Sequence, residues 1–238
     1  ARVYVLLDTI DQSYVPQTLP PVSSMAVGKL VKYRLNKDFP NEEIKGALRM
    51  ERQTQGRRDW NYMMIAAERN AAVGMWLDFL DEFPNWVHGV YLVPVEAAII
   101  ARELRRHMVP PSDDKLAKPA LWQFLVSYNK VSGVRQIILR DGKIVFTCLG
   151  QPVGELTPLV IAGNIEQEVL STMEYMKRLG FQPEQGLEIY IISAADIAHG
   201  IDTAKFSAQY VYRLTPHEIG EMLAIEGAVV NHTPSLFD

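Results

Sequence analysis

The sequence predicts an α/β fold with mixed sheets and flanking helices, divided into two lobes. Strand-like apolar runs alternate with long amphipathic helical segments along most of the 238 residues, as expected for helices packed on sheets. An Asp-Gly pair, Asp141-Gly142, separates two β-rich runs. A Pro-Pro-Ser-Asp-Asp stretch at 110–114 predicts a linker. We therefore predict an N-terminal lobe at 1–109 and a C-terminal lobe at 115–238.

The N-terminal lobe begins with a continuous apolar run that ends at Asp8, which predicts a buried strand. Prolines then enforce extended chain, and polar residues that cap helices precede two amphipathic segments. The elements predicted for this lobe are strands at 3–7, 44–50, 60–67 and 87–93, and helices at 25–39 (capped by Ser23-Ser24), 71–83 (capped by Asn70) and 94–107.

The C-terminal lobe is organised around a three-strand meander whose second turn is Asp141-Gly142. An Asp-Gly pair between apolar runs predicts a type I′ hairpin, because that turn needs positive φ at both central residues. The hairpin spans 134–149. The elements predicted for this lobe are strands at 121–127, 134–139, 143–149, 187–192 and 210–214, and helices at 165–179 and 216–225, the latter with a Thr215–Glu218 capping box.

The composition is that of a globular protein and excludes several function classes. The chain is 48% hydrophobic with a net charge of −4 and no basic stripe, so we expect no nucleic-acid partner. Its one cysteine, Cys148, excludes a disulfide framework and a cysteine zinc site, and indicates a reducing compartment. No apolar run of about 18 residues is present. The chain begins at Ala1 and not at a methionine, so we expect it to be part of a longer protein. Whether a membrane segment lies outside these 238 residues is an open question.

No complete catalytic or metal-binding motif is present. The sequence lacks a Walker loop, a G-x-G-x-x-G, a G-x-S-x-G and an H-E-x-x-H, and its five histidines are scattered. Asp8 is the best-placed acid, because ligands of α/β sheets bind beyond strand C-termini. Glu166 and Glu168 lie on an amphipathic helix and are interpreted as part of a solvated face. We therefore predict no catalytic residue and no metal site.

Several stretches together resemble the actin-like cytoplasmic components of type IV pilus and type II secretion assembly platforms, the PilM-like proteins and the cytoplasmic domain of the GspL-like proteins. The likeness is one of order and pattern and covers about residues 2–200. The stretches that resemble this family are VYVLLDTIDQSYVPQTLP, MAVGKLVKYRLNKDFP, VHGVYLVPVEAAII, SGVRQIILRDGKIVFTCLG, IEQEVLSTMEYMKRLGF and LEIYIISAADI.

The resemblance implies an actin/hexokinase-like (ribonuclease H-like) fold in a cytoplasmic protein at the cytoplasmic face of the inner membrane. Its partners would be the hexameric assembly ATPase and bitopic inner-membrane proteins of the same machine, with a homodimer as a further assembly to test. Such a protein would act as a scaffold and not as an enzyme, with no cofactor. The alternative within the same machinery is an actin-like protein that binds ATP and Mg²⁺. A third hypothesis, an unrelated α/β enzyme, also stays open.

Nucleotide-site residues of the family match this sequence only in degenerate form. Asp8 is followed by no glycine, unlike the first phosphate hairpin of actin-like ATPases. The second phosphate hairpin corresponds to Ser132 and Gly133, with Arg135 as a residue that either meets a phosphate or points outward from its strand. Residues 193–196 lack the paired glycines of an adenosine site. These three departures from the nucleotide-site motifs favour the interpretation that the fold is retained for protein contacts.

Overall fold

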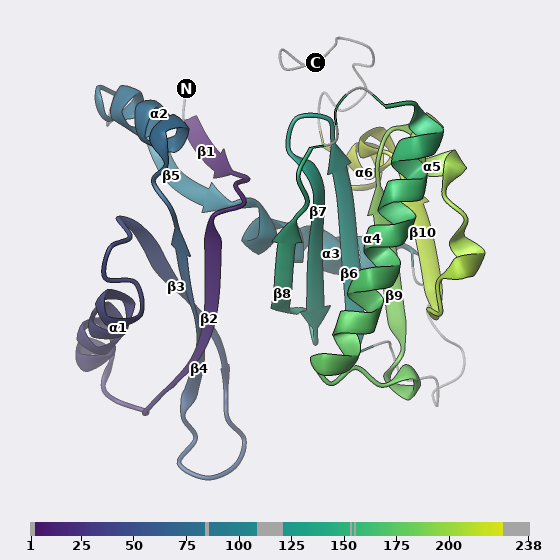
Figure 1. Cartoon of the computed structure of the whole chain (residues 1–238). Helices are drawn as coiled ribbons and strands as arrows, with labels where there is room; N and C mark the ends of the chain where they lie inside the picture. The colour runs from purple at the N-terminus through teal and green to yellow at the C-terminus, as the bar shows by residue number, and fades with distance from the viewer. Residues whose placement is uncertain (1–2, 84–85, 109–120, 153, 155, 226–238) are drawn as a thin grey trace. The chain divides into compact units, whose positions relative to one another are not determined.

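The structure, a computed structural model, describes residues 3–83, 86–108, 121–152, 154 and 156–225. Contacts divide the chain into two compact units, Ala1–Val90 and Tyr91–Asp238, and each is described by itself (Figure 1). The predicted linker at 110–114 lies outside the described residues. The predicted boundary after residue 109 places the helix at 94–107 in the first lobe. In the structure this helix, α3 (Val93–Met108), packs on the sheet of the second unit.

The first unit contains a three-stranded antiparallel sheet in the order β2 (Gln12–Leu19), β4 (Trp60–Ala67) and β3 (Ile44–Arg52). The β2–β4 register runs from Gln12 opposite Ala67 to Leu19 opposite Trp60. Pro16 is tolerated because β2 is an edge strand, where a missing N–H breaks no ladder. Helix α1 (Ser24–Asp38) packs on one face of this sheet, and Ser23 caps it as predicted.

A second, two-stranded sheet of this unit pairs β1 (Val3–Leu7) with β5 (Val87–Leu92), and α2 (Ala71–Asp81) is capped by Asn70. The prediction of a buried first strand is wrong. Tyr4 and Leu6 are each 58% exposed, since alternate side chains of β1 point away from the core. Trp76 of α2 is also 58% exposed, although it stands at helical spacing from other apolar residues of this helix.

The second unit is built on a five-stranded mixed sheet in the order β10 (Tyr210–Leu214), β9 (Leu187–Ile192), β6 (Trp122–Asn129), β7 (Gly133–Arg140) and β8 (Lys143–Leu149). Strands β6, β7 and β8 form the predicted antiparallel meander, whereas β9 and β10 run parallel to β6. The I′ turn is confirmed, with φ of 52° at Asp141 and 69° at Gly142.

Helices cover both faces of this sheet (Figure 1). Helix α4 (Pro158–Arg178) packs on one face together with α5 (Ala195–Gly200), while α3 and α6 (Pro216–Met222) pack on the other. Two short 3-10 turns, Pro183–Gln185 and Thr203–Lys205, complete the unit. Within the described ranges, no helix is both long and apolar enough to span a membrane.

Helix α4 begins seven residues before the predicted start at Ile165. Pro158 occupies the first helical turn, where its fixed φ and missing N–H cost nothing. Ile161 and Ala162, which the sequence placed before the helix, are buried in its core cluster. Packing on the sheet therefore extends the helix through Gly163 and Asn164, two residues of low helix propensity.

Candidate functional site

The candidate site lies in the second unit, at the edge where the parallel strands β6, β9 and β10 end. Ligands of α/β folds bind beyond this edge. A pocket of about 600 Å³ is present there. Its lining is mostly apolar, with one lysine and one aspartate, and includes Tyr128, Asn129, Lys130, Leu156, Pro158, Ile161, Ala194, Asp196, Ile197 and Pro216.

The turn between β6 and β7, residues 130–132, precedes Gly133 and belongs to the hairpin that the family resemblance matches with the second phosphate hairpin of actin-like ATPases. Here a side chain of the protein, that of Asn129, accepts hydrogen bonds from two backbone N–H groups of the turn. The Oδ1 atom of Asn129 accepts from the Val131 N–H at 2.8 Å and from the Ser132 N–H at 3.3 Å. Successive backbone N–H groups in a turn are the donors with which such loops bind anions. Two of these donors are therefore already satisfied within the turn.

Gly133, the glycine of the predicted phosphate hairpin, is required by packing. Its φ is +91°, and a Cβ built on it would lie 2.4 Å from the carbonyl oxygen of Gly150. The Gly150 N–H in turn donates to the Val134 carbonyl at 2.8 Å. The close approach of the chain leaving β8 explains this glycine without any ligand.

Arg135 lies within strand β7 and not in the turn. Its side chain is 3% exposed, and Nη1 donates to Thr147 Oγ1 at 3.4 Å. Of the two alternatives for Arg135, the outward position does not hold, because both faces of the interior strand β7 are covered by packed elements.

Asp8 belongs to the first unit, where it follows β1 and is half-buried. Ser132, Gly133 and Arg135 belong to the second unit, so the structure groups only these three of the predicted residues. Among the described residues, no cluster of three or more histidine, cysteine or carboxylate groups has the arrangement of a metal site.

Asn129 and Lys130 are the site residues that sequence reasoning missed. The pattern that predicts the role of Asn129 is an asparagine at a strand end, because its short amide readily bonds backbone N–H groups two and three residues on. Lys130 is exposed and lines the pocket together with Asp196. Asp196 Oδ1 accepts from the Ile197 N–H at 2.9 Å.

A half-buried polar cluster lies beside the turn, between β7, β8 and α4. Gln136 Nε2 donates to Glu168 Oε2 at 2.9 Å, and Gly150 leaves room for this carboxylate. Burial raises the pKa of Glu168, and the Gln136 bond partly offsets the rise. Burial, with the Glu168 charge, also raises the pKa of Cys148 to about 11. This thiol stays protonated at neutral pH and is a poor nucleophile.

The interpretation of Glu166 and Glu168 as a solvated face is wrong. Glu166 is 5% exposed. Its Oε1 accepts from the Asp202 N–H at 2.6 Å, and its Oε2 pairs with Lys205 Nζ at 2.5 Å. These contacts hold the chain after α5 against α4, because a buried carboxylate needs such partners.

A second buried carboxylate, Glu188 of β9, has its partners on the opposite face of the sheet, where its Oε2 accepts hydrogen bonds and its Oε1 has an ion pair without a hydrogen bond. Arg105 Nη2 lies 3.2 Å from its Oε1, and the Tyr190 hydroxyl donates to its Oε2 at 2.9 Å. Burial raises the pKa of Glu188 in spite of the Arg105 charge. The group lies near the start of β9, away from the candidate pocket, so we regard it as structural.

No protein-family model and no curated protein sequence matches the chain. Among solved structures, a chain of a PilM-PilN type IV pilus biogenesis complex matches with a TM-score of 0.57 and 15% identity, over 92% of this chain and 70% of that one. A Bacteroides thetaiotaomicron protein of actin-like ATPase fold and unknown function matches with a TM-score of 0.45 and 9% identity, over 90% and 68%. The first likeness shows the fold, and the predicted actin-like α/β fold is confirmed.

Proposed function

We propose that this chain is a non-enzymatic scaffold of a type IV pilus or type II secretion inner-membrane assembly platform. It would lie at the cytoplasmic face of the inner membrane and link the hexameric assembly ATPase to bitopic platform proteins. The likeness of fold to a chain of the PilM-PilN complex supports this choice of machine. By analogy with that complex, a PilN-like protein is the first partner to test.

The observation that supports a scaffold most strongly is the pair of hydrogen bonds that Asn129 accepts from the turn after β6. Phosphate binding at this turn would require the Val131 and Ser132 N–H groups to exchange an internal acceptor for a ligand. Exposed apolar side chains are next in sequence to lining residues of the pocket: Val131 is 60% exposed, Leu159 71% and Val160 46%. Exposed apolar residues and a mostly apolar pocket suit a protein partner better than a triphosphate.

The alternative, an actin-like protein that binds ATP and Mg²⁺, is favoured by one observation. The pocket holds a cation, Lys130, and an acid, Asp196, at the edge where a nucleotide would bind. These two groups alone do not make a phosphate cradle, since the neighbouring backbone donors are occupied. The residues present therefore fit the nucleotide poorly.

A titration with a fluorescent ATP analogue and Mg²⁺, with thermal melting in parallel, separates these two functions. The scaffold predicts no saturable binding up to millimolar nucleotide and an unchanged melting temperature. Micromolar binding with a raised melting temperature would establish the ATP-binding alternative instead, because a ligand that binds only the folded state stabilises it.

Site-specific photo-crosslinking in the native host tests the scaffold directly. A photoreactive residue replaces Leu159, which follows the pocket-lining Pro158 in the sequence, or Lys177, which is 63% exposed near the other end of α4. We expect the Leu159 position to crosslink to a PilN-like protein or to the assembly ATPase, and the Lys177 position to give markedly less of that product. Equal crosslinking at both positions, or none to these proteins, would contradict the proposal.

A further inference from the structure

The β3–β4 hairpin of the first unit projects beyond the strand that flanks it. Strand β2 ends at Leu19, which pairs with Trp60. The chain between β3 and β4, residues 53–59, extends beyond the Leu19–Trp60 pair, which is the last pair between β2 and β4. No β2 residue pairs with it. The tip is closed by a Gln53 N–H bond to the Asp59 carbonyl at 2.8 Å. It is therefore an ordered, accessible projection.

A β-bulge in this hairpin brings two arginines over one tryptophan. The register shifts between Arg49 and Arg52. Residues three apart on a regular strand point to opposite faces, and a bulge redirects one of them. As a result, the guanidinium carbon of Arg49 lies 4.5 Å from the centre of the Trp60 ring and that of Arg52 lies 5.7 Å from it.

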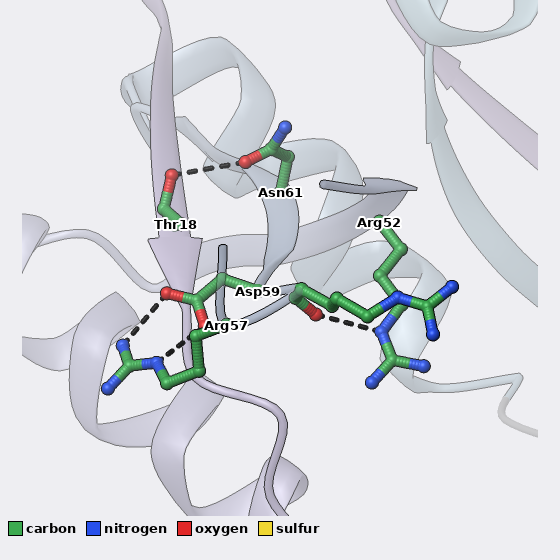
Figure 2. A network of polar contacts seen from close by, with 6 residues as sticks. Thr18, Arg52, Arg57, Asp59 and Asn61 are labelled. Carbon is green, nitrogen blue, oxygen red and sulfur yellow. Dashed lines mark hydrogen bonds and ion pairs between the residues drawn. The ribbon is translucent and has the colours of Figure 1, made fainter. Parts of the chain in front are cut away.

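The hairpin also fixes the Arg52 guanidinium through a hydrogen bond. Arg52 Nε donates to the backbone carbonyl of Arg58 at 2.8 Å (Figure 2). This bond uses Nε and leaves the two Nη groups of Arg52 for other acceptors. Arg58 itself adopts a left-handed conformation, with φ of 61°. Stacking and this bond restrict the rotamers of Arg52. The Arg52 side chain therefore loses less conformational entropy when a ligand binds.

The two carboxylates of the hairpin are engaged elsewhere. Asp59 takes both hydrogen bonds of Arg57, at 2.7 and 2.8 Å, as Figure 2 shows. Glu51 accepts from Asn61 Nδ2 at 3.0 Å. In the part of the chain that the structure describes, no carboxylate forms an ion pair with Arg49, Arg52 or Arg58, and all three are exposed. The hairpin therefore has an excess of positive charge in a chain whose net charge is −4.

We propose that Arg49, Arg52 and Arg58 form a docking site for a carboxylate-rich segment of a protein partner. Planar guanidinium groups bind carboxylates in bidentate fashion, and Trp60 holds two of them in place. Residues 51–59 include no apolar side chain, so the tip has nothing to insert into a bilayer, as membrane-binding segments do. These features favour an acidic polypeptide over an anionic lipid surface.

A fluorescein-labelled deca-glutamate peptide serves as the probe, with binding followed by fluorescence anisotropy. We expect saturable binding that weakens as salt rises. The triple variant R49Q/R52Q/R58Q should lose at least tenfold in affinity. The matched control K29Q/K32Q/K37Q removes three exposed lysines from α1 of the same unit and should bind like the unaltered chain. Circular dichroism confirms that both variants fold.

A conservative triple variant, R49K/R52K/R58K, keeps the charge but removes the planar groups, and we expect it to bind several-fold more weakly than the unaltered chain. The proposal is overturned if the peptide does not bind, if both glutamine triples lose equal affinity, or if the lysine triple binds normally. Cosedimentation with phosphatidylglycerol vesicles that requires the three arginines, without peptide binding, would assign the site to a membrane surface instead. None of these results depends on the turn at 130–132.

Discussion

A glycine of positive φ stands at each end of strand β7, Gly133 as its first residue and Gly142 in the turn that follows it, but the two glycines are required for different reasons. At Gly142, no described atom lies within 4 Å of the position of an added Cβ. At Gly133, an added Cβ would lie 2.4 Å from the Gly150 carbonyl oxygen. The Asp141-Gly142 turn is thus determined by local backbone preference, whereas the glycine at position 133 is required by a contact with the chain that leaves β8.

This difference shows why a glycine in a hairpin is weak evidence for a phosphate site. Gly133 has the position of a phosphate-loop glycine, but its lack of a side chain is explained by packing against Gly150. The donors of its turn are likewise explained by Asn129. The following predictions test whether the two ends of β7 differ in this way, starting with the largest effect.

Gly133→Ala should be the most damaging of these changes. A left-handed alanine costs roughly 1–2 kcal/mol, and the forced backbone shift adds about 1–3 kcal/mol, so we expect a loss of about 3 kcal/mol or more. Urea unfolding followed by circular dichroism measures it. A loss under about 1 kcal/mol would mean that the Gly150 contact is not a tight one.

Gly142→Ala should cost only the strain of a left-handed alanine, about 1–2 kcal/mol, because the described structure leaves space for the new methyl group. The same unfolding experiment gives the value. If this variant is as unstable as Gly133→Ala, the two ends of β7 do not differ as described.

Asn129→Ala removes the acceptor of two amides in an exposed turn, which water then hydrates. We expect a loss of about 1 kcal/mol, the usual net value of such bonds. Asn129→Asp is the matched control, since it keeps the acceptor and should retain most of the stability. Equal stability of the alanine variant and the unaltered chain would show that the Asn129 bonds do not hold the turn.

The smallest effect is a pH dependence that comes from Glu168. Its folded pKa is raised above its ordinary value of 4.5, so between these two values the folded state binds more protons than the unfolded state. Stability should therefore fall as pH rises from about 4.5 through the raised pKa. Glu168→Gln, which preserves the acceptor for Gln136, should reduce this slope by the Glu168 contribution, while the contribution of Glu188, whose pKa is also raised, remains in both proteins. Urea midpoints at several pH values for both proteins provide the test, and a difference of opposite sign between the two slopes would contradict the raised pKa.

Local sequence predicted much of the fold. The caps at Ser23, Asn70 and Thr215 and the turn at Asp141 depend on a few neighbouring residues, and all are present in the structure. The β6–β7–β8 meander follows from short connections between apolar runs, which also limited its possible pairings.

Features that depend on distant residues could not be predicted in this way. Burial of Glu166 is tolerated because Lys205, 39 positions away, forms an ion pair with its carboxylate. The periodicity of a helix does not indicate such a distant partner. Trp76 shows the converse, since helical spacing cannot tell a covered apolar face from an exposed one. Of the candidate site, the sequence located Ser132 and Gly133 on a turn, but the roles of Gly150 and Asn129 required coordinates.

Asn129 accepts hydrogen bonds from two backbone N–H groups of the turn after β6, and on this ground we propose that the turn binds no phosphate. The most direct measurement follows the backbone amide resonances of Val131 and Ser132 by ¹H–¹⁵N NMR as Mg-ATP is added to millimolar concentration. We predict that both resonances stay at their positions, because their N–H groups remain bonded to Asn129 Oδ1. Saturable shifts of these two amides would show that a phosphate displaces Asn129, and would contradict the account.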